Sequence, residues 1–588
     1  MSQLNPAEQA SVEALEKLRQ CIDNNQCFRL EAGAGAGKTY SLIESIKYLI
    51  DNRAEEFLRN EQKIACITYT NVAKDEIRDR TDRHPAIFAD TIHAFCWSVL
   101  QNYQVKLREL ISSLGDKWIE RINEIGGITT QSVKYELGFP SINDKEITLH
   151  HDDVISLMEK MLFFPKLQQQ LKSKFPIIFI DEYQDTDIAL AESIVSNLID
   201  NDSGLVVGLF GDHWQKIYGS SACGLISTAS GKIIEIGKKA NFRSDKNIVE
   251  CLNRMRPNLP QSESNPQSQG IIKVFHSNDW NGSRRDGKGG GHWTNDLPEE
   301  NVKEYINKVK ELMIADGWDL SAKNTKILFL TNNLIASEQN FKNLADCYRY
   351  SDDYLKKGDK YIQFFLEIVE PTISAFERKE YGELFQIGRK NHPHLQSQAD
   401  KKLWSENLNR LMEERTTGTV GDVLYLLSKS KTPLFSAKVE LSEERYAAAL
   451  LKKGLGINLD DEEDAFLKKQ QKIRSIDYQE VINLGKYIDE KTPFSTKHGV
   501  KGAEFDNVLV VFGRGWNHYN WGQMLEWIAD GVPKNEEEKF DRNRNLFYVS
   551  CSRAKHNLTI LFTQELSKKA LSVVQEIFGK DSIIGDPF

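Results

Sequence analysis

The stretch that decides the fold runs from residue 27 to residue 39 and reads Cys-Phe-Arg-Leu-Glu-Ala-Gly-Ala-Gly-Ala-Gly-Lys-Thr. A short apolar strand leads into a loop of alternating alanine and glycine, and a helix is expected from Tyr40 to Ile50. A loop whose backbone N–H groups converge on a triphosphate needs small residues, a helix N-terminus, one cation and one hydroxyl. The stretch therefore predicts a nucleotide-phosphate loop.

Each residue type in this loop has an expected role. Glycines allow the backbone to approach the phosphates, Lys38 would reach the β- and γ-phosphates of ATP, and the Thr39 hydroxyl would bind Mg²⁺. The strict pattern has glycine six residues before the lysine, where this chain has Ala32. The residues expected to hold the nucleotide here are Ala32, Gly33, Ala34, Gly35, Ala36, Gly37, Lys38 and Thr39.

Length and composition indicate several domains with packed cores, because the chain has 588 residues of which 40% are hydrophobic. The sequence has no apolar run near the ~20 residues of a membrane span and no signal-peptide pattern, so we expect a cytoplasmic protein without a membrane partner. The eight cysteines are scattered without a C-x-x-C pair, which argues against zinc or iron–sulfur sites. A net charge of −9 argues against an overall basic surface but allows a local basic groove.

Two later apolar strands end in side chains suited to phosphate chemistry. The first, at 176–180, ends in Asp181 and Glu182. Paired carboxylates after a continuous apolar run are typical of a central parallel strand, and Asp181 would bind Mg²⁺ while Glu182 acts as the general base. The second strand, at 205–211, is followed by Gln215, which would sense the γ-phosphate or the attacking water.

Polar residues also follow two other expected strands. Tyr69, Thr70 and Asn71 come after the strand at 63–68, and His93 begins the helix after another strand. Ligands lie at the carboxyl ends of strands in parallel sheets. Thr70 and Asn71 suit sugar–phosphate contacts and Tyr69 could flank a base, whereas His93 taken alone is more often structural.

Arginines far apart in the sequence are candidates for the transition-state charge. Arg243 opens a helix beside Phe242, whose ring offers a flat surface for adenine. Arg553 lies on an otherwise apolar segment and is a better arginine finger than Arg542 or Arg544, which fit a solvated helix.

Two features leave alternatives open. Gln9 would either read the adenine edge or lie on a solvated helix face, and we give the two interpretations equal weight. The aromatic stretch with Trp516, Trp521 and Trp527 would either stack on bases or fill a local core, and the core is favoured.

Eight motifs follow one another along the chain: 32–39, 68–71 (Thr-Tyr-Thr-Asn), 91–95 (Thr-Ile-His-Ala-Phe), 181–185 (Asp-Glu-Tyr-Gln-Asp), 211–215 (Gly-Asp-His-Trp-Gln), 241–244 (Asn-Phe-Arg-Ser), 496–505 (Thr-Lys-His-Gly-Val-Lys-Gly-Ala-Glu-Phe) and 548–554 (Tyr-Val-Ser-Cys-Ser-Arg-Ala). This series resembles that of the UvrD/PcrA/Rep-type helicases of superfamily one. The order of the motifs and their spread over nearly the whole chain make the resemblance specific.

The resemblance implies an α/β fold with two RecA-like P-loop lobes built on parallel sheets, each carrying a helical insertion. The expected segments are 1–96 (first lobe with the phosphate loop), 97–174 (its insertion), 175–245 (first lobe continued), 246–350 (second lobe), 351–478 (its insertion) and 479–588 (second lobe continued).

The resemblance also implies an ATP- and Mg²⁺-dependent motor that moves 3′→5′ on single-stranded or partly duplex DNA. Besides the phosphate loop, the implied nucleotide site contains Asp181, Glu182, Gln215, Arg243, Glu504 and Arg553. The residues implied to face DNA are Tyr69, Thr70, Asn71, His93 and His498.

The chain departs from the family after Gln215. The family usually continues with Tyr-Gly-Trp-Arg-Gly, whereas here Tyr218 and Gly219 precede Ser220 and Ser221. Loss of a stacking Trp and a phosphate-binding Arg argues against efficient unwinding. In its size and in these departures from the family pattern, the chain resembles the helicase-like subunits that accompany an OLD-family nuclease in anti-phage systems such as Gabija. A translocating helicase and a regulatory ATPase subunit of a nuclease complex therefore both stay open, and a P-loop ATPase without a nucleic-acid role is disfavoured.

Overall fold

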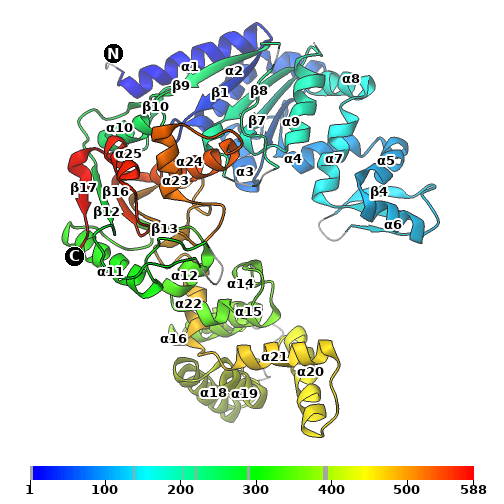
Figure 1. Ribbon diagram of the computed structural model, residues 1–588. Helices are drawn as coiled ribbons and strands as arrows, with labels where there is room; N and C mark the ends of the chain where they lie inside the picture. The colour runs from blue at the N-terminus through cyan, green and yellow to red at the C-terminus, as the bar shows by residue number, and fades with distance from the viewer. Residues whose placement is uncertain are drawn as a thin grey trace. The chain divides into compact units, whose positions relative to one another are not determined.

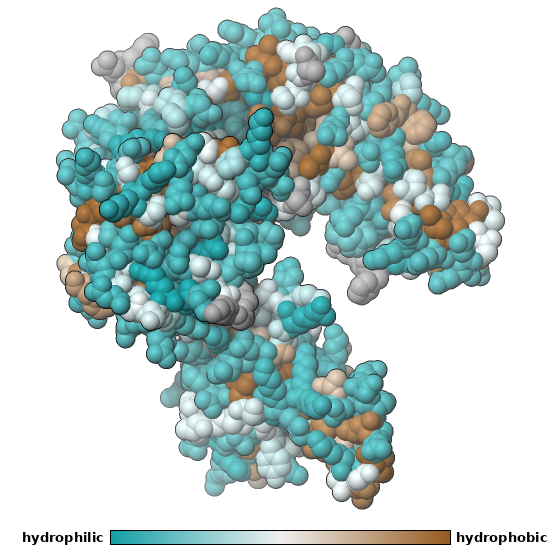
Figure 2. Space-filling view, in the orientation of Figure 1, coloured by the Kyte–Doolittle hydropathy of each residue, from teal (hydrophilic) through white to brown (hydrophobic). Residues whose placement is uncertain are grey.

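The computed structural model describes residues 4–136, 140–201, 203–217, 219, 221–228, 230–287, 292–387 and 395–588. The chain forms two compact units, which are described separately. The first contains Met1–Leu297 and Lys497–Phe588, and the second contains Pro298–Thr496. The face drawn in Figure 2 is mostly hydrophilic, with apolar side chains in small patches. Within the described ranges, every helix lacks the combined length and apolarity that crossing a membrane requires.

A parallel sheet of six strands forms the N-terminal part of the first unit (Figure 1). Its strand order is β3-β2-β7-β8-β1-β9. The strands are β1 (Cys27–Ala32), β2 (Ile64–Thr68), β3 (Ile87–Thr91), β7 (Ile177–Asp181), β8 (Val206–Gly211) and β9 (Ile233–Lys238). Every residue of β1, β2, β7 and β8 is buried, as expected for parallel strands covered on both faces. The strand ends that carry the predicted site residues therefore meet at one edge.

Helices cover this sheet with two separate apolar clusters. One cluster packs Leu18 and Leu42 against Phe28, and the other packs Phe95 and Leu190 around residues of the same sheet. Gly208 on β8 faces the first of these clusters, and a Cβ atom there would approach the Phe28 ring to 2.5 Å. The helices are α1 (Pro6–Asp23), α2 (Lys38–Arg59), α3 (Asn71–Arg80), α4 (Ile92–Leu100) and α9 (Ile188–Ile194, continued by a π-helical turn at Val195–Ile199).

The segment between α4 and β7 differs from its prediction. It contains α5 (Gln104–Ile111), α6 (Asp116–Glu124), α7 (His151–Met161) and α8 (Pro165–Lys174), but also a sheet of order β4-β6-β5. These strands are β4 (Ser132–Tyr135), β5 (Ser141–Ile142) and β6 (Glu146–Leu149). The predicted helical insertion thus also contains a small sheet, in which Ile147 and Leu149 are buried on alternate residues of β6 and Val133 is buried on β4.

The C-terminal part of the first unit has a second set of parallel strands, in the order β15-β16-β12-β17. They are β12 (Ile271–His276), β15 (Phe505–Phe512), β16 (Ala554–Phe562) and β17 (Ile583–Gly585). A short parallel pair, β10 (Ala240–Asn241) and β11 (Ser262–Glu263), lies nearby in sequence. The helices of this part are α10 (Lys246–Met255), α23 (Trp521–Asp530), α24 (Glu537–Cys551) and α25 (Lys568–Phe578).

The second unit is mostly helical. Its strands β13 (Thr325–Phe329) and β14 (Phe494–Thr496) pair in parallel. Its helices are α11 (Glu299–Ala315), α12 (Asn332–Glu338), α13 (Lys342–Ala345), α14 (Asp352–Leu355), α15 (Lys360–Phe364, continued by a π-helical turn at Phe365–Val369), α16 (Glu370–Glu377), α17 (Tyr381–Ile387), α18 (Gln398–Thr417), α19 (Val420–Ser430), α20 (Ala437–Gly454), α21 (Asp461–Arg474) and α22 (Gln479–Ile488). The predicted α/β fold with parallel sheets is confirmed, whereas the six segment boundaries stay a prediction.

Candidate nucleotide site

The phosphate loop connects β1 to α2, and its conformation explains its glycines. Gly37 caps the N-terminus of α2 with φ 72°, and Gly35 has φ 76°. Both values lie in the left-handed region that favours glycine. A Cβ atom on Gly35 would also come within 2.8 Å of the Asn241 Oδ1 atom. The chain must therefore have glycine here for both conformation and space.

Side chains from distant segments hold the loop in place. The Lys238 Nζ donates to the Gly37 carbonyl at 3.0 Å and to the Ser41 hydroxyl at 2.7 Å. The Gln261 amide donates to the Ala34 carbonyl at 3.2 Å, and the Ala34 N–H donates to the Tyr548 hydroxyl at 3.3 Å. The loop is thus fixed by residues that the sequence did not identify.

The Lys38 ammonium lies beside the carboxylates of Asp181, the last residue of β7, and of Glu182, which follows it. Its Nζ is 2.5 Å from Glu182 Oε2, while Asp181 Oδ1 accepts the Glu182 N–H at 3.0 Å. Burial by itself lowers the pKa of Lys38, but Glu182 and Asp181 outweigh it and hold the pKa above its usual value. The structure therefore brings the predicted cation and both predicted carboxylates together.

The two carboxylates differ in their surroundings. Burial raises the pKa of Asp181 to about 6 in spite of the nearby Lys38 cation. Burial also acts to raise the pKa of Glu182, but Lys38 and Lys501 lower it to about 2. Glu182 has φ 50°, a left-handed conformation that costs a non-glycine residue ~1 kcal/mol or more and is concentrated at functional sites.

Residues from the C-terminal segment come to the same region. Lys501 pairs with Asp185 at 2.6 Å, and Arg243 pairs with Glu504 at 3.0 Å. Arg243 also donates to the Ser552 carbonyl at 2.9 Å. The structure thus brings the predicted residues Arg243 and Glu504 together.

Arg553 is fully buried beside this pair. Its guanidinium donates to the carbonyls of Val549 and Ala503, at 2.9 and 3.1 Å, and to the Ser552 hydroxyl at 2.9 Å. Burial lowers the pKa of Arg553 to about 9, and the nearby Arg243 cation adds to this effect. Neutral oxygens hold the guanidinium in this structure, so its charge is available to an anion that approaches it.

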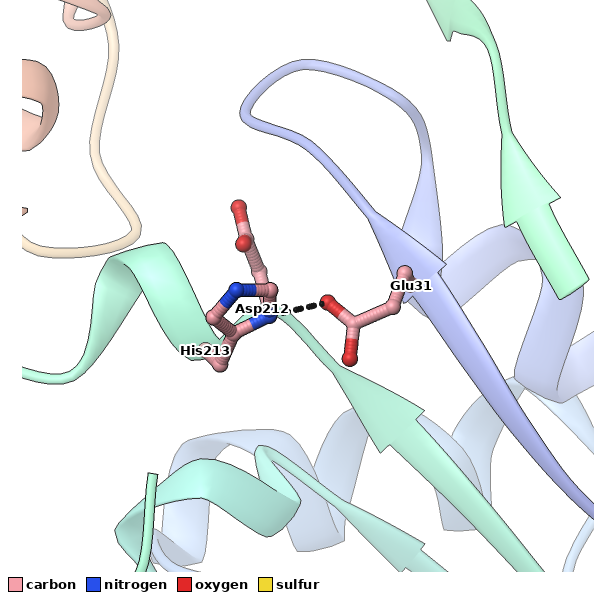
Figure 3. Close-up of side chains that lie close together, drawn as sticks. All are labelled: Glu31, Asp212 and His213. Carbon is pink, nitrogen blue, oxygen red and sulfur yellow. Dashed lines mark hydrogen bonds and ion pairs between the residues drawn. The ribbon is translucent and has the colours of Figure 1, made fainter. Parts of the chain in front are cut away.

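A buried polar network supports Gln215. In this network, Glu31, Asp212 and His213 have the mutual spacing of metal ligands (Figure 3). The buried Arg256, however, pairs with Asp212 at 2.7 Å and with Glu31 at 3.5 Å. Arg29 lies 3.1 Å from Glu31. We therefore interpret the cluster as an ion-pair network rather than a metal centre.

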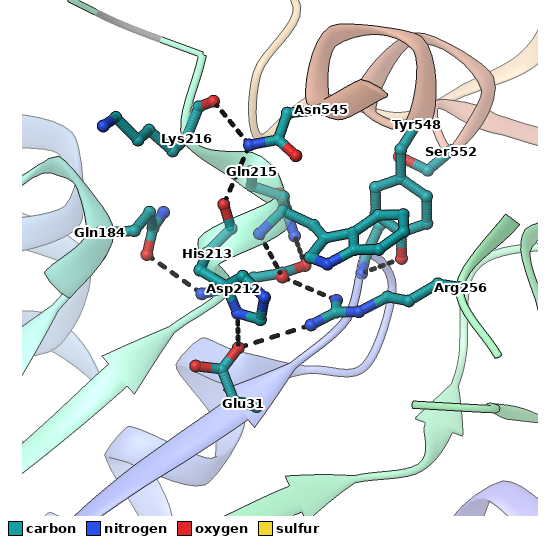
Figure 4. A network of polar contacts seen from close by, with 12 residues as sticks. Glu31, Gln184, Asp212, His213, Gln215, Lys216, Arg256, Asn545, Tyr548 and Ser552 are labelled. Atoms are coloured by element: carbon teal, nitrogen blue, oxygen red, sulfur yellow. Dashed lines mark hydrogen bonds and ion pairs between the residues drawn. The ribbon is translucent and has the colours of Figure 1, made fainter. Parts of the chain in front are cut away.

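This network fixes the orientation of Gln215. The Gln215 Nε2 donates to the Asp212 carboxylate at 2.8 Å, and Arg256 holds the other oxygen of that carboxylate. Asn545 on α24 donates to the carbonyls of His213 and Lys216, at 3.1 and 3.2 Å. The short helical turn His213–Gln215 is therefore held from both sides (Figure 4).

Replacing Arg256 by alanine is expected to lower the free energy of unfolding by about 3–5 kcal/mol, because it leaves the buried Asp212 carboxylate without its guanidinium and removes one of the two that pair with Glu31. Thermal denaturation followed by circular dichroism measures the loss. Arg254→Ala is the matched control, since Arg254 lies exposed on the same helix and donates to the Ile577 carbonyl. Equal destabilisation by both substitutions would contradict a special role of Arg256.

Lys238, which holds the phosphate loop, makes the free energy of unfolding depend on pH. It is fully buried, and burial lowers its pKa to about 8. Between pH 8 and the usual lysine pKa the unfolded chain binds more protons at this residue, so the free energy of unfolding rises with pH. We expect a rise of about 2 kcal/mol between pH ~7.5 and ~9.5 in the wild type relative to Lys238→Met, measured by urea denaturation. Parallel pH curves for the two proteins would contradict this.

The residues predicted to face DNA lie at neighbouring strand ends. The Tyr69 hydroxyl donates to Thr186 Oγ1 at 2.6 Å, and Thr70 caps the N-terminus of α3. Asn71 is exposed and accepts from Lys74 at 2.9 Å. His93 packs edge-on against His151 with ring centroids 4.7 Å apart. Since β2 and β3 are adjacent, these residues occupy one edge of the sheet.

Three other predicted residues lie in different surroundings. Gln9 is exposed on α1, where its amide contacts Glu13 at 3.5 Å, so its role in adenine recognition stays a prediction. Phe242 is 43% exposed, and its N–H donates to the Gly35 carbonyl at 2.8 Å, which places it beside the phosphate loop. His498 contacts the Tyr519 hydroxyl at 3.1 Å. Tyr218 and Ser220 lie outside the described residues.

Comparisons with known proteins agree with the order of the motifs. Two family models match the chain, an AAA domain at residues 16–221 and a UvrD-like helicase C-terminal domain at residues 452–565. The resemblance to UvrD-like helicases is confirmed. The two matched ranges contain the phosphate loop with its carboxylates and the segment with Glu504 and Arg553.

Two known proteins are similar to this chain, and they match different shares of its length. The Gabija protein GajB of Bacillus cereus (strain HuB5-5) is 27% identical over 97% of this chain and 98% of that protein. The ATP-dependent DNA helicase PcrA of Staphylococcus aureus is 24% identical over 51% of this chain, and the match spans 45% of PcrA. The resemblance to GajB therefore covers nearly the whole chain, including the helical second unit.

A solved structure, the Pif1 helicase from Candida albicans, matches 57% of this chain and 54% of its own, with a TM-score of 0.26 and 14% identity. This likeness is too low to support a conclusion. The fold description rests on the strand order of this chain itself.

Four buried residues of this candidate site were not predicted from the sequence: Lys238, Arg256, Gln261 and Tyr548. Tyr548 opens the last of the eight motifs, and this position was the one available signal. The other three are single polar residues without a pattern, and only the structure shows that they contact the loop or Asp212.

Proposed function

We propose that this chain hydrolyses ATP with Mg²⁺ and uses the energy to move 3′→5′ along single-stranded DNA. The main support is the meeting of Lys38, Asp181 and Glu182 at one sheet edge, with the Arg243–Glu504 pair and Arg553 nearby in the same compact unit. Phosphoryl transfer requires cations and a water-orienting carboxylate in this arrangement.

The residues present fit ATP and Mg²⁺. The Lys38 ammonium already binds an anionic oxygen, as it would bind a phosphate oxygen. The Thr39 hydroxyl and the Asp181 carboxylate are the hard oxygen ligands that Mg²⁺ prefers. Bound Mg²⁺ neutralises charge that develops on the phosphates. We assign adenine stacking to Phe242, whose ring is exposed beside the loop.

The pairing of Lys38 with Glu182 suggests how nucleotide binding activates the base. When Lys38 turns to the phosphates, Glu182 loses the cation that lowers its pKa most. Its pKa then rises, and the carboxylate becomes a stronger acceptor for the proton of the attacking water. Gln215 orients that water, and Arg243 and Arg553 stabilise the transition-state charge. We propose this division of roles for the predicted site.

Single-stranded DNA contacts the edge formed by the ends of β2 and β3 in this proposal. Tyr69, Thr70, Asn71 and His93 lie there, and His498 contacts DNA from the C-terminal segment. The six segments expected from the sequence are proposed as the lobes and insertions of this motor, which acts in the cytoplasm.

Displacement of streptavidin from biotinylated oligonucleotides tests the direction of movement. A 3′→5′ motor removes streptavidin from the 5′ end faster than from the 3′ end, and only with hydrolysable ATP. Faster removal from the 3′ end would contradict the proposed direction. The non-hydrolysable analogue serves as the control for simple displacement by binding.

A second candidate function is a regulatory ATPase subunit of a nuclease-containing anti-phage complex, with an OLD-family nuclease as partner. It is favoured by the match to GajB over nearly the full length of both chains and by the serines that replace the family's Trp-Arg. In that case the purified chain alone would show little strand displacement, and its hydrolysis would require the partner.

A further inference from the structure

Lys238, the last residue of β9, places a buried cation beside the phosphate loop. Its side chain is fully buried, and its Nζ donates to the Gly37 carbonyl at 3.0 Å and to the Ser41 hydroxyl at 2.7 Å. We propose that Lys238 is a positioning residue for ATP, whose ammonium orients the N-terminus of α2 and strengthens binding of the triphosphate. This role rests on the proposed ATP-dependent function and goes beyond it, because none of the eight motifs includes Lys238.

The partners of the Lys238 ammonium are neutral. Within the described ranges, its side chain contacts the carbonyl and the hydroxyl named above and the rings of Tyr40 and Phe242, whose centroids lie 5.5 and 5.9 Å from Nζ. The buried Arg256, in contrast, pairs with Asp212 at 2.7 Å. A buried ammonium without a carboxylate is costly to keep charged. An anion that binds close to Lys238 would offset this cost.

The ammonium lies at the end of a helix where a cation is unfavourable. α2 begins at Lys38, and Gly37 is its N-cap residue. The N-terminus of a helix has a partial positive charge, so a further cation there is stabilised only when an anion lies nearby. The triphosphate of ATP is expected at this terminus, because the N–H groups of a helix N-terminus bind phosphate. Lys238 therefore adds to the attraction of the site for phosphate.

The hydrogen bond to Gly37 also fixes a peptide group of the loop. The Gly37 carbonyl and the Lys38 N–H belong to one trans peptide unit, in which they point in opposite directions. The carbonyl accepts from Lys238 and, at 3.1 Å, from the Ser41 N–H. The Lys38 N–H is thereby directed away from Lys238, and in this proposal it points toward the phosphates.

The protonation of Lys238 changes in an accessible range of pH, because burial lowers its pKa to about 8. Few titratable groups face it from the elements packed against β9. Tyr40 contacts it from α2, Ala32 is its partner on β1, and the buried face of α1 has Cys21 as its one titratable side chain. Bound triphosphate favours the ammonium, so ATP binding raises the pKa of Lys238. The affinity for ATP therefore falls as the pH rises above ~8.

Equilibrium binding of a fluorescent ATP analogue with Mg²⁺, measured on the full chain from pH ~7.5 to ~9.5, tests this role. At pH ~7.5, Lys238→Met is expected to bind the analogue about tenfold more weakly than the wild type, because methionine fills the space without the charge. The affinity of the wild type should fall about tenfold across the range and approach that of the variant, whose curve should be flatter. Arg553, whose pKa is also lowered, is present in both proteins, so the difference between the curves belongs to Lys238.

Two further measurements sharpen the comparison. Competition by inorganic tripolyphosphate should show the same difference of about tenfold between the wild type and Lys238→Met, because the ammonium acts on the phosphates and not on the base. Lys239→Met is the matched control and should bind as the wild type does, because Lys239 is the next residue and is exposed.

The possible results separate the role of Lys238 from the function on which it rests. A loss of affinity that is the same at every pH, or no loss, would overturn the role of the ammonium alone. Weaker binding of the analogue with unchanged binding of tripolyphosphate would also overturn it. Failure of the wild type to bind either probe would overturn the proposed ATP-dependent function as well. Thermal melting verifies that the compared proteins are folded, and Lys238→Gln, which keeps a neutral donor, replaces Lys238→Met if that variant does not fold.

Discussion

Lys38→Ala is expected to reduce the rate of ATP hydrolysis by about 10²- to 10³-fold, because it removes the cation that stabilises charge on the transferring phosphate. The substitution also removes the partner of Glu182 at 2.5 Å, so the carboxylate loses the interaction that lowers its pKa most. Steady-state phosphate release at saturating ATP measures the effect.

The matched control for this prediction is Lys47→Ala. Lys47 lies on the same helix with a side chain that is 48% exposed, and it pairs only loosely with Glu44 at 3.4 Å. Hydrolysis in this variant should equal that of the wild type. If Lys38→Ala hydrolysed ATP at the wild-type rate, the assignment of the phosphate loop would be wrong.

Glu182→Gln is expected to lower hydrolysis by about 10²- to 10⁴-fold while ATP binding is retained, because the amide keeps the shape of the side chain but accepts no proton. Removal of the negative charge also releases Lys38 for the phosphates, so affinity for ATP should not fall. Equilibrium binding of a fluorescent ATP analogue and steady-state hydrolysis, measured on the same preparation, separate the two effects.

Glu192→Gln serves as the control for this substitution. Glu192 is exposed on α9, the helix that follows the carboxylates in sequence. Its variant should bind and hydrolyse ATP normally. Unchanged hydrolysis in Glu182→Gln would assign the general base to another residue, whereas loss of binding with hydrolysis would indicate that Glu182 shapes the loop.

The central parts of the site were predictable because their residue types are dictated by local chemistry. Glycine at positions 35 and 37 follows from the left-handed backbone, and Lys38 and Glu182 follow from the charges of phosphate transfer. The parallel sheet was predictable from continuous apolar strands that end in polar residues. In these cases, residues close together in the sequence are enough to explain why each residue type is present.

The supporting residues were not predictable, because their partners lie far away in the sequence. Lys238 contacts Gly37 across 201 residues, and Tyr548 contacts Ala34 across 514 residues. From the sequence alone, a single lysine at a strand end is expected to be exposed to solvent. Only the fold shows that Lys238 is buried. The same holds for Trp516 and Trp521, which are five residues apart but differ fully in exposure.

Short strands were a further limit of prediction. In the segment between α4 and β7, β4 and β6 are only four residues long, and burial alternates along β6 but not along β4. Such a short pattern is indistinguishable from part of a helix until its partner strand is known. The sheet of β4, β6 and β5 therefore became visible only in the structure.

The central claim is that DNA binding stimulates ATP hydrolysis at the phosphate loop, and the most direct test is the rate of ATP hydrolysis by the purified full chain with and without single-stranded DNA. The account predicts that saturating single-stranded DNA raises the rate in the wild type and leaves the Lys38→Ala variant inactive under both conditions. A wild-type rate that is the same with and without DNA would contradict the account and favour the partner-dependent ATPase.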